Sequence, residues 1–479
     1  PTCGKGNFLL ATIKQSKYLK KVVGVEIYQP YVWETKFKIL EHFILVNKNT
    51  KPEIDIIHAN AFEFSFNNLA KSTQDFKILI IGNPPWVTNS ELGSIDSKNL
   101  PLKSNFKKHS GFEAITGRGN FDMGEYISLK MLRCFDSHYG IFAFLIKNSV
   151  IRNLIYDQKQ NKFRMSQVVN LNIDSKKEFN VYVNASLFLT NLNTEAKFTC
   201  SAYDFYTGNK LTNFGWYKNK FVYSIEDYDE SSIIDGKSTF IWRSGLKHDC
   251  SKVMELEQID GYLKNALGEV IDIENDLIYG LLKSSDLKEN ETNSVRKLTI
   301  ITQRKIGQDT KWIKYKLPLT YNYLNSHKDF FHKRKSSIYK DKPEFSIFGI
   351  GDYSFAPYKV AISGLYKSTH FTLVNPFNTK PIMLDDTCYF IGFDNRKMAE
   401  IAHYLMNSEL VQKFLKSIIF SDSKRSINKD TLMRIDFENA FENEKFEKAK
   451  GVIKNLDMGH WEKFGEKVKK DVSKQITLF

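Results

Sequence analysis

Short apolar runs alternate with amphipathic stretches over the first third of the chain. Four runs rich in Ile, Val and Phe predict strands, at residues 21–27, 54–59, 78–82 and 140–146. The spacing of apolar positions predicts a helix over 124–135. Because these strands are apolar on both faces, we expect a mostly parallel sheet covered on both sides by helices. Two more runs, the second at 185–190, are expected to close this sheet near residue 195.

The pattern changes after this first domain. Residues 196–241 lose the alternation and fill with Tyr, Asp, Ser and Lys, which is typical of a connecting segment with short strands. The remainder combines turn-rich stretches, a basic run and late helical patterns without an internal repeat. We therefore expect a first domain over 1–195, a connecting segment over 196–241 and a second globular domain over 242–479, whose fold the pattern does not define.

Composition narrows the class of protein. The 479 residues are 42% hydrophobic, enough for two or three domain cores. No apolar run approaches the roughly 18 to 20 residues of a membrane-spanning helix, so we expect no membrane partner. The five cysteines follow no Cys-x-x-Cys or Cys/His spacing, which predicts neither a metal site nor a disulfide framework and suits a reducing cytoplasm.

The net charge of +14 suits a polyanionic partner, because neutralising phosphates supplies much of the affinity for nucleic acid. The same excess of Lys would follow from a composition crowded with Lys, Asn, Ile, Phe and Tyr, as in proteins from AT-rich genomes. Charge alone leaves both explanations open.

The opening stretch PTCGKGNFLLATI is a glycine-rich turn followed by a helical pattern. Around Gly4 and Gly6 the backbone can approach a ligand closely. Glu26 ends the next strand and can accept hydrogen bonds from both hydroxyls of a ribose. Asn60 follows the strand after that and can bind the amino group of an adenine, with Phe62 beside its ring. Each is by itself an ordinary turn or surface residue, but together they indicate an adenosyl ligand.

The spacing of the glycines separates two classes of adenosyl ligand. The turn has the form Cys-Gly-x-Gly-x-Phe, whereas dinucleotide-binding turns have the form Gly-x-Gly-x-x-Gly. We therefore expect S-adenosylmethionine as the cofactor.

The strand at 78–82 runs into Asn83, Pro84, Pro85 and Trp86. To alkylate an exocyclic amine that is conjugated with an aromatic ring, an enzyme must accept hydrogen bonds from both of its N–H groups. The side-chain carbonyl of Asn83 and the backbone carbonyl of Pro84 can do so, in geometry fixed by the prolines. Trp86 can stack on the base, which offsets part of the few kcal/mol that extruding it costs. A rigid turn followed by a core tryptophan is the structural alternative.

Five segments resemble one family in order and spacing: PTCGKGNFL, GVEI, NAF, IGNPPWV and GNFDMGEYISLKML. They are similar to the adenine-N6 DNA methyltransferases of restriction-modification systems with the gamma-type motif order, in which the cofactor half comes first. The resemblance covers roughly the first 190 residues, and NPPW is its most specific part. It implies a Rossmann-like α/β methyltransferase sheet with a distal target-recognition domain. It also implies that Cys3, Gly4 and Gly6 line the methionine end of the cofactor, that Glu26 binds the ribose and that Asn83 to Trp86 hold the target adenine.

Three details differ from the family or align loosely. Asn60 stands where the family often has aspartate, which keeps an acceptor and removes the charge. Phe179, in KKEFNVYVNAS, matches the aromatic residue that stacks on the other face of the flipped base in some members, and it suits a core position equally well. The family has an aspartate just before the first proline, so we expect the first strand of the domain, and any upstream segment, to be missing from this sequence.

The distal half resembles the target-recognition domains of such methyltransferases in three segments, FIWRSGLKHDCSKVMEL, RKSSIYKDKPEFSIFGIGDYSFAPYKVAISGLYK and SDSKRSINKDTL. Positive side chains in turn-rich segments can reach a duplex, and each can equally be a solvated charge. The candidate DNA contacts are Lys247, His248, Arg334, Lys335, Lys424 and Arg425.

The expected activity is methyl transfer from S-adenosylmethionine to N6 of a flipped adenine in a specific sequence of double-stranded DNA. N4-cytosine methylation is the nearest alternative, since that amine poses the same problem, although Asn rather than Ser before the prolines favours adenine. RNA or protein-glutamine methylation is less consistent with the large distal domain, and a silent DNA-specificity subunit is a further alternative. The expected partners are DNA and a cognate restriction endonuclease, separate or fused upstream.

Overall fold

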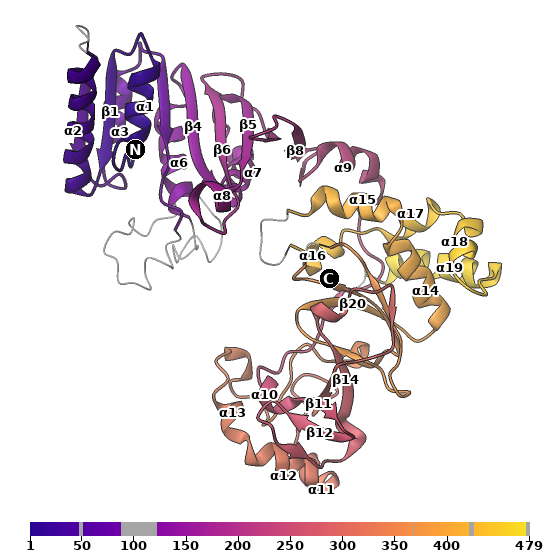
Figure 1. Ribbon diagram of the computed structural model, residues 1–479. Coiled ribbons are helices and arrows are strands. Elements are labelled where there is room, and N and C mark those ends of the chain that lie inside the picture. Colours follow the sequence, from indigo (N-terminus) through magenta and orange to yellow (C-terminus); the bar gives the residue numbers. More distant parts are fainter. Residues whose placement is uncertain (47–50, 88–121, 367, 421–425, 476–479) are drawn as a thin grey trace. The chain divides into compact units, whose positions relative to one another are not determined.

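The computed structural model describes residues 1–46, 51–87, 122–366, 368–420 and 426–475. It divides into two compact units, Pro1–Ile225 and Glu226–Phe479. The boundary falls inside 196–241, the stretch expected to connect two domains. Figure 1 shows the elements of both units in chain order.

The first unit contains the strands and the helix that the apolar pattern predicts, with bounds that differ by at most three residues. Its strands are β1 (Lys21–Glu26), β2 (Glu53–His58), β3 (Ile78–Gly82), β4 (Gly140–Lys147), β5 (Met165–Ile173), β6 (Ala185–Leu192), β7 (Thr199–Asp204), β8 (Lys210–Tyr217) and β9 (Lys220–Val222). Its helices are α1 (Asn7–Gln15), α2 (Gln29–Val46), α3 (Phe66–Ser72), α6 (Met123–Phe135), α7 (Asn148–Asn161) and α8 (Ser175–Phe179).

These strands form two sheets. β1 pairs with β2 in parallel, and the other seven strands have the order β3-β4-β6-β5-β7-β8-β9. The larger sheet is mixed, which differs from the mostly parallel sheet expected, because β6 runs antiparallel to both of its neighbours. The link from β5 to β6 holds only the five-residue helix α8, whereas a parallel return needs a crossover of a dozen or more residues.

One apolar cluster packs α1 and α2 on the smaller sheet. Its buried members are Leu9, Ile13, Val22, Val32, Ile39, Phe43 and Ile56. The glycine at position 24 of β1 allows this close packing, because a Cβ there would lie 2.8 Å from Leu9 Cδ1. This packing therefore fixes the strand whose end carries Glu26.

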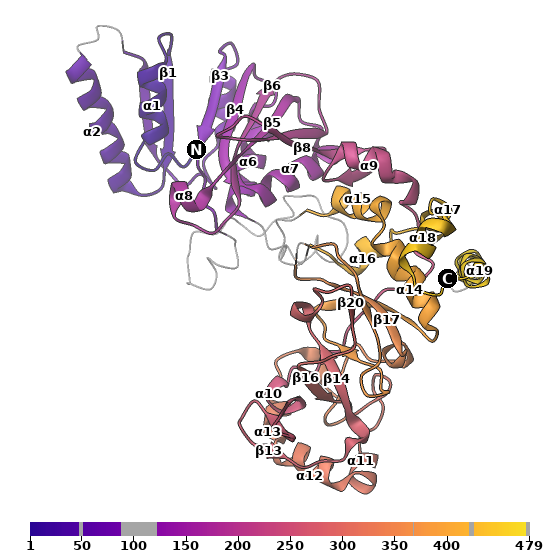
Figure 2. The same cartoon turned by 45° about the vertical axis from the view of Figure 1, so that its right-hand side comes forward.

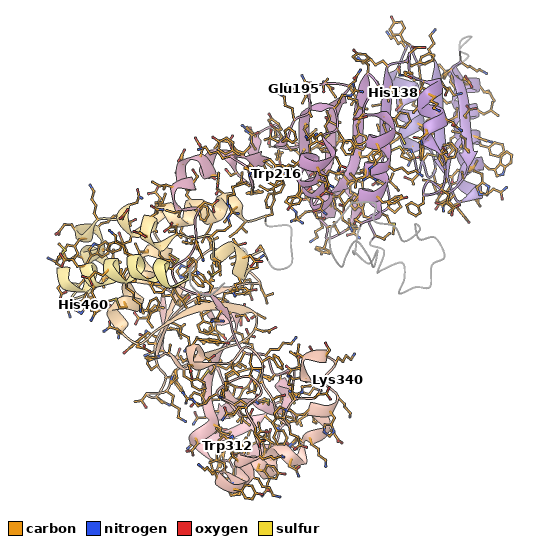
Figure 3. All side chains as sticks on the ribbon, turned by 180° about the vertical axis from the view of Figure 1, so that it is seen from behind. His138, Glu195, Trp216, Trp312, Lys340 and His460 are labelled. Carbon is orange, nitrogen blue, oxygen red and sulfur yellow. The ribbon has the colours of Figure 1, made fainter. Side chains whose placement is uncertain are left out.

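Trp216 ties the last strands of the larger sheet to α7 (Figure 3). Its Nε1 donates to the backbone carbonyl of Tyr156 at 2.9 Å. Lys159 Nζ lies 4.2 Å from the centre of the indole ring, a distance at which the cation is attracted to the ring face. β7, β8 and β9 are therefore part of the first unit, although they come from the stretch expected to connect two domains.

The second unit is built from two mixed sheets followed by helices. The six-stranded sheet has the order β13-β12-β11-β16-β14-β19 and the five-stranded sheet the order β10-β20-β17-β18-β15. The strands are β10 (Arg243–Ser244), β11 (Glu255–Ile259), β12 (Tyr262–Asn265), β13 (Val270–Ile271), β14 (Ile278–Leu282), β15 (Glu291–Thr292), β16 (Lys297–Ile300), β17 (Tyr358–Ser363), β18 (Thr372–Val374), β19 (Met383–Leu384) and β20 (Cys388–Phe393).

One helix precedes the strands of this unit, four lie among them and six follow the last strand, within the described residues. They are α9 (Ile225–Ser231), α10 (Ser251–Met254), α11 (Trp312–Lys316), α12 (Pro318–Ser326), α13 (Lys328–His332), α14 (Arg396–Met406), α15 (Glu409–Ile418), α16 (Lys429–Leu432), α17 (Phe437–Glu442), α18 (Phe446–Val452) and α19 (Met458–Gln475). α14 and α15 occupy the late helical stretch that the sequence predicts. Within the described ranges, no helix has both the length and the apolar surface to cross a membrane.

Candidate functional site

The opening motif lies between the carboxyl ends of β1 and β3, which belong to the two different sheets of the first unit. Cys3 donates its backbone N–H to Val25 O at 2.9 Å, next to the end of β1. On the other side, a Cβ built on Gly82 at the end of β3 would lie 3.4 Å from Pro1 O. Figure 2 shows the N-terminus between β1 and β3. The structure thus brings the glycine turn next to the segment that carries Asn83.

Glu26 is the charged group at the centre of this edge. Only 8% of it is exposed, and its two carboxylate oxygens accept hydrogen bonds from the backbone N–H groups of Gly4 (2.8 Å) and Tyr28 (2.9 Å). Each oxygen has a second lone pair, so the carboxylate can still accept the two hydroxyls of a ribose. The residues present therefore fit an adenosyl group.

The two glycines of the turn have different reasons to be glycine. Both have positive φ, 55° at Gly4 and 74° at Gly6, a region that favours glycine. A Cβ on Gly6 would lie 2.4 Å from Thr35 Cγ2 in α2, so this glycine allows the turn to pack on the helix. No atom lies within 4 Å of a Cβ built on Gly4, so that position leaves open space at the turn.

Cys3 is half-buried beside the turn, where burial and then the charge of Glu26 raise the pKa of its thiol to about 11. The thiol is therefore neutral at pH 7, and it can line a ligand without acting as a nucleophile.

Asn60 and Phe62 lie close to Glu26 because of the strand register. Glu26 is paired with His58 across the parallel strands, so Asn60 follows two residues beyond that pair. Asn60 Oδ1 accepts the backbone N–H of Phe62 at 3.0 Å, and its second lone pair can accept from an adenine amino group. The Phe62 ring makes an edge contact with Tyr126 at 5.5 Å between ring centres, which orients it.

Two neighbours of Glu26 were not among the residues named from the sequence. Ile27 and Tyr28 are 45% and 54% exposed, although both are apolar enough to be buried at a strand end. An apolar side chain directly after an acidic strand end is the signal that could have identified them, since an adenine ring needs an apolar face to lie on.

The segment Asn83 to Trp86 alternates between exposed and covered positions. Asn83 and Pro85 are exposed and Pro84 is buried. Among the described residues, no hydrogen bond to the Asn83 side chain is present. Trp86 Nε1 donates to Leu145 O in β4 at 3.2 Å. The indole position is thus fixed by β4.

The structure also brings Trp86 and Phe179 together. Their ring centres are 5.6 Å apart and their planes are nearly perpendicular, at 86°. Phe179 ends α8, a helix capped by Asp174, whose side chain accepts the backbone N–H groups of Lys176 and Lys177. With 43% of its surface exposed, Phe179 is no core residue.

Two of the candidate DNA contacts in the second unit, the buried His248 and the partly exposed Arg334, are engaged by the fold itself. His248 is 6% exposed, its Nδ1 accepts the backbone N–H of Cys250 at 3.1 Å, and burial lowers its pKa to about 4. Arg334 donates to the carbonyls of Phe331, His248 and Ser346. Both side chains therefore make their hydrogen bonds within the second unit.

The other four candidates divide into two pairs. Lys247 is partly exposed, with Nζ 3.5 Å from Asp249 Oδ2, and Lys335 is exposed. Lys424 and Arg425 lie outside the described residues.

An exposed basic turn at 303–308 was missed by the sequence analysis. The buried Gln303 accepts the backbone N–H of Ile347 at 2.8 Å, and Gln308 accepts that of Arg304 at 2.7 Å. These bonds hold a turn that presents Arg304, Lys305 and Ile306, the last 49% exposed. The short run Arg-Lys-Ile-Gly between two glutamines was the available signal.

Arg304 is further oriented by an aromatic ring. Its guanidinium carbon lies 4.0 Å from the centre of the Phe355 ring, within the range of a cation–π contact. A guanidinium held in this way loses less conformational freedom on meeting a ligand. Among the described residues, no group of three or more His, Cys, Asp or Glu side chains is arranged to hold a metal ion.

Comparison with known proteins finds a relative of similar length and solved structures that align over most of this chain. The chain is 38% identical over 440 residues to the type II methyltransferase M.NspV of Nostoc sp. (strain ATCC 29411 / PCC 7524), which covers 91% of this chain and 90% of that protein. The structure of the type IIL restriction-modification enzyme MmeI in complex with DNA aligns with a TM-score of 0.56 and 14% identity, over 99% of this chain and 69% of that one. No protein-family model matches the chain. The structural likeness confirms the expected α/β fold with a second distal domain.

Proposed function

The chain belongs to the type II methyltransferases of restriction-modification systems, and we propose that it transfers a methyl group to N6 of a flipped adenine within a specific sequence of double-stranded DNA. The methyl donor of this family is S-adenosylmethionine. The observation that carries the choice of an exocyclic amine is the exposed Asn83 amide beside the Trp86–Phe179 ring pair.

The chemistry of the step assigns a role to each group of this edge. The cofactor supplies an electrophilic methyl group when bound. Asn83 Oδ1 and Pro84 O would accept the two N–H groups of the target amine, so that its lone pair turns out of conjugation toward the methyl. Positive charge then develops on the nitrogen, where the two fixed acceptors stabilise it. The methylated amine is acidic and loses its proton without a dedicated side-chain base.

The ring pair suits an extruded base. The perpendicular arrangement of Trp86 and Phe179 leaves ring faces on which a base can stack. Stacking of this kind contributes roughly 1 to 3 kcal/mol per base, comparable with the few kcal/mol that flipping costs. Both purines and pyrimidines could stack here, so the rings do not separate adenine from cytosine.

The choice of adenine over cytosine rests on Asn83 and the resemblance of NPPW to adenine-N6 enzymes. N4-cytosine methylation is the second candidate, because its amine needs the same two acceptors. A cognate restriction endonuclease is the proposed partner, since a restriction-modification system needs both activities.

We assign sequence recognition to the second unit. The turn at 303–308, which two side-chain hydrogen bonds hold in place, presents the guanidinium of Arg304 and the ammonium of Lys305. Such groups bind phosphates or guanine edges in duplex DNA. Lys247 and Lys335 stay as proposed contacts because they are accessible. The interior contacts of His248 and Arg334 favour a supporting role for these two residues.

Sequencing of modified bases tests this function. The full-length gene is expressed in a host without DNA methylation, and its genome is scored by long-read sequencing. N6-methyladenine at one recurring sequence is the expected result. N4-methylcytosine at one sequence would move the assignment to the second candidate, and an unmodified genome with folded protein would refute DNA methylation.

A further inference from the structure

Helix α6 holds the Asn83 loop from one side. Met123, the first residue of α6, donates its backbone N–H to Val87 O at 2.9 Å. At the next position a Cβ on Gly124 would lie 3.6 Å from Pro84 Cγ, so the helix start lies against the proline ring. The positions of the two acceptor oxygens of this loop, Asn83 Oδ1 and Pro84 O, therefore depend on where α6 begins.

Strand β4 holds the loop from the other side, through the bond from Trp86 Nε1 to Leu145 O. Two residues further, at the end of β4, Lys147 Nζ lies 2.8 Å from Asp122 Oδ2. The two side chains are only 15% and 10% exposed. The other oxygen of Asp122 accepts the backbone N–H of Gly124 at 2.9 Å and caps α6. A shielded ion pair thus joins the two elements that hold the loop.

We propose that Lys147 and Asp122 are positioning residues for methyl transfer. Their ion pair fixes the start of α6 relative to the end of β4, and with it the Asn83 and Pro84 oxygens around the target amine. This inference rests on the proposed function. A misplacement of about 1 Å can cost on the order of 100-fold in rate, and a shielded pair is stiffer than one in water because the local dielectric is low.

Three possible roles of the ion pair differ in how the effects of Lys147 and Asp122 depend on each other. If Lys147 instead contacted a phosphate directly, its loss would weaken DNA binding, and Asp122 would matter little. If the pair only stabilised the fold, its loss would lower the melting temperature without changing the rate per folded molecule. Positioning through the pair requires that either change lowers the rate and that the second change adds nothing.

The test is a double-mutant cycle with Lys147→Met and Asp122→Asn. Asparagine keeps the oxygen that caps α6 and removes the charge. Single-turnover methylation at saturating DNA and S-adenosylmethionine is expected to fall about 10- to 100-fold in each single variant and no further in the double variant. The Kd for DNA and for cofactor should stay within about twofold, and Lys147→Arg should restore most of the rate.

Lys21→Met is the matched control, because Lys21 pairs with Glu53 and Asp55 on exposed surface at the other end of β1. It should leave the rate unchanged. Independent rate losses that multiply in the double variant, or a weakened Kd for DNA in Lys147→Met alone, would overturn the proposal.

Hydrogen exchange tests the same proposal without activity. The backbone amide of Met123, which is bound to Val87 O, should exchange faster in Asp122→Asn than in the wild-type protein. Unchanged exchange would overturn the proposal even if the variants were inactive. Should the wild-type protein methylate no DNA, the proposed function fails, while the exchange measurement still decides whether the pair positions the loop.

Discussion

Asn83 carries the chemical proposal at the scale of a single residue. Replacing it with alanine removes one of two acceptors for the target amine, and loss of one such preorganised group costs about 100- to 1,000-fold in rate. We expect Asn83→Ala to lower single-turnover methylation by at least this factor, with DNA affinity within about twofold. Asn68→Ala on the exposed surface of α3 is the control. A variant with wild-type turnover would refute the role given to Asn83.

A buried lysine in the second unit predicts a pH effect on stability. Lys359 of β17 is fully buried, its Nζ donates to Ala356 O at 2.7 Å, and burial lowers its pKa to about 7. In the unfolded chain the pKa returns to the usual value near 10.5. The unfolded state therefore binds the proton more tightly, so this residue's contribution to stability is largest above pH 10.5 and is lost as the pH falls toward 7.

The variant Lys359→Met lacks this titration. Between pH 7 and pH 10 the free energy of unfolding of the wild-type protein should rise relative to the variant, by on the order of 3 kcal/mol. Urea denaturation at a series of pH values measures the difference between the two proteins, which cancels the titration of other groups. A difference that stays constant with pH would show that Lys359 titrates normally in the folded state.

Helix α2 shows at the scale of an element that apolar character does not by itself predict burial. Ile39 is 3% exposed in the cluster that packs on β1 and β2, whereas the adjacent Leu40 is 51% exposed. Ile39→Ala should lower the free energy of unfolding by about 2 to 5 kcal/mol, and Leu40→Ala by less than about 0.5 kcal/mol. Thermal or urea unfolding measures both, and equal losses would mean that Leu40 is covered in solution.

The turn at 303–308 makes a prediction about recognition. If Arg304 reads a base edge, Arg304→Ala should weaken binding to the cognate sequence by roughly 1 to 3 kcal/mol and relax the preference at one base pair. Binding to unrelated DNA should change less. Lys463→Ala, at an exposed position of α19, is the control. An equal loss on cognate and unrelated DNA would reassign Arg304 to a phosphate.

The net charge of +14 makes a prediction at the scale of the whole molecule. If the excess of Lys and Arg serves DNA binding, each phosphate contact releases counterions and the affinity falls steeply with salt. We expect at least a tenfold loss of DNA affinity between about 50 and 200 mM salt, which corresponds to two or more phosphate contacts. Measurement of the Kd in a salt series tests this. A flat dependence would favour the compositional explanation of the charge.

The sequence by itself determined which chemistry sits at the strand ends. The apolar runs located the strands. Glu26 ends one of them, and Asn60 and Asn83 each follow another closely. The reacting amine stays a proposal, whereas the cofactor could be predicted, because parallel pairing places such ends on one edge. The antiparallel return of β6 could not, because the apolar pattern of a strand carries no direction.

Tertiary structure alone decided which charges are accessible. Lys335 and Arg334 are adjacent and equally basic in the sequence, yet one is exposed and the other donates to three backbone carbonyls. The same holds for Trp86 with Phe179, and for Lys147 with Asp122, which are far apart in the chain and meet only in the fold. Exposure and contact depend on which surfaces pack together, and residues distant in sequence set that packing.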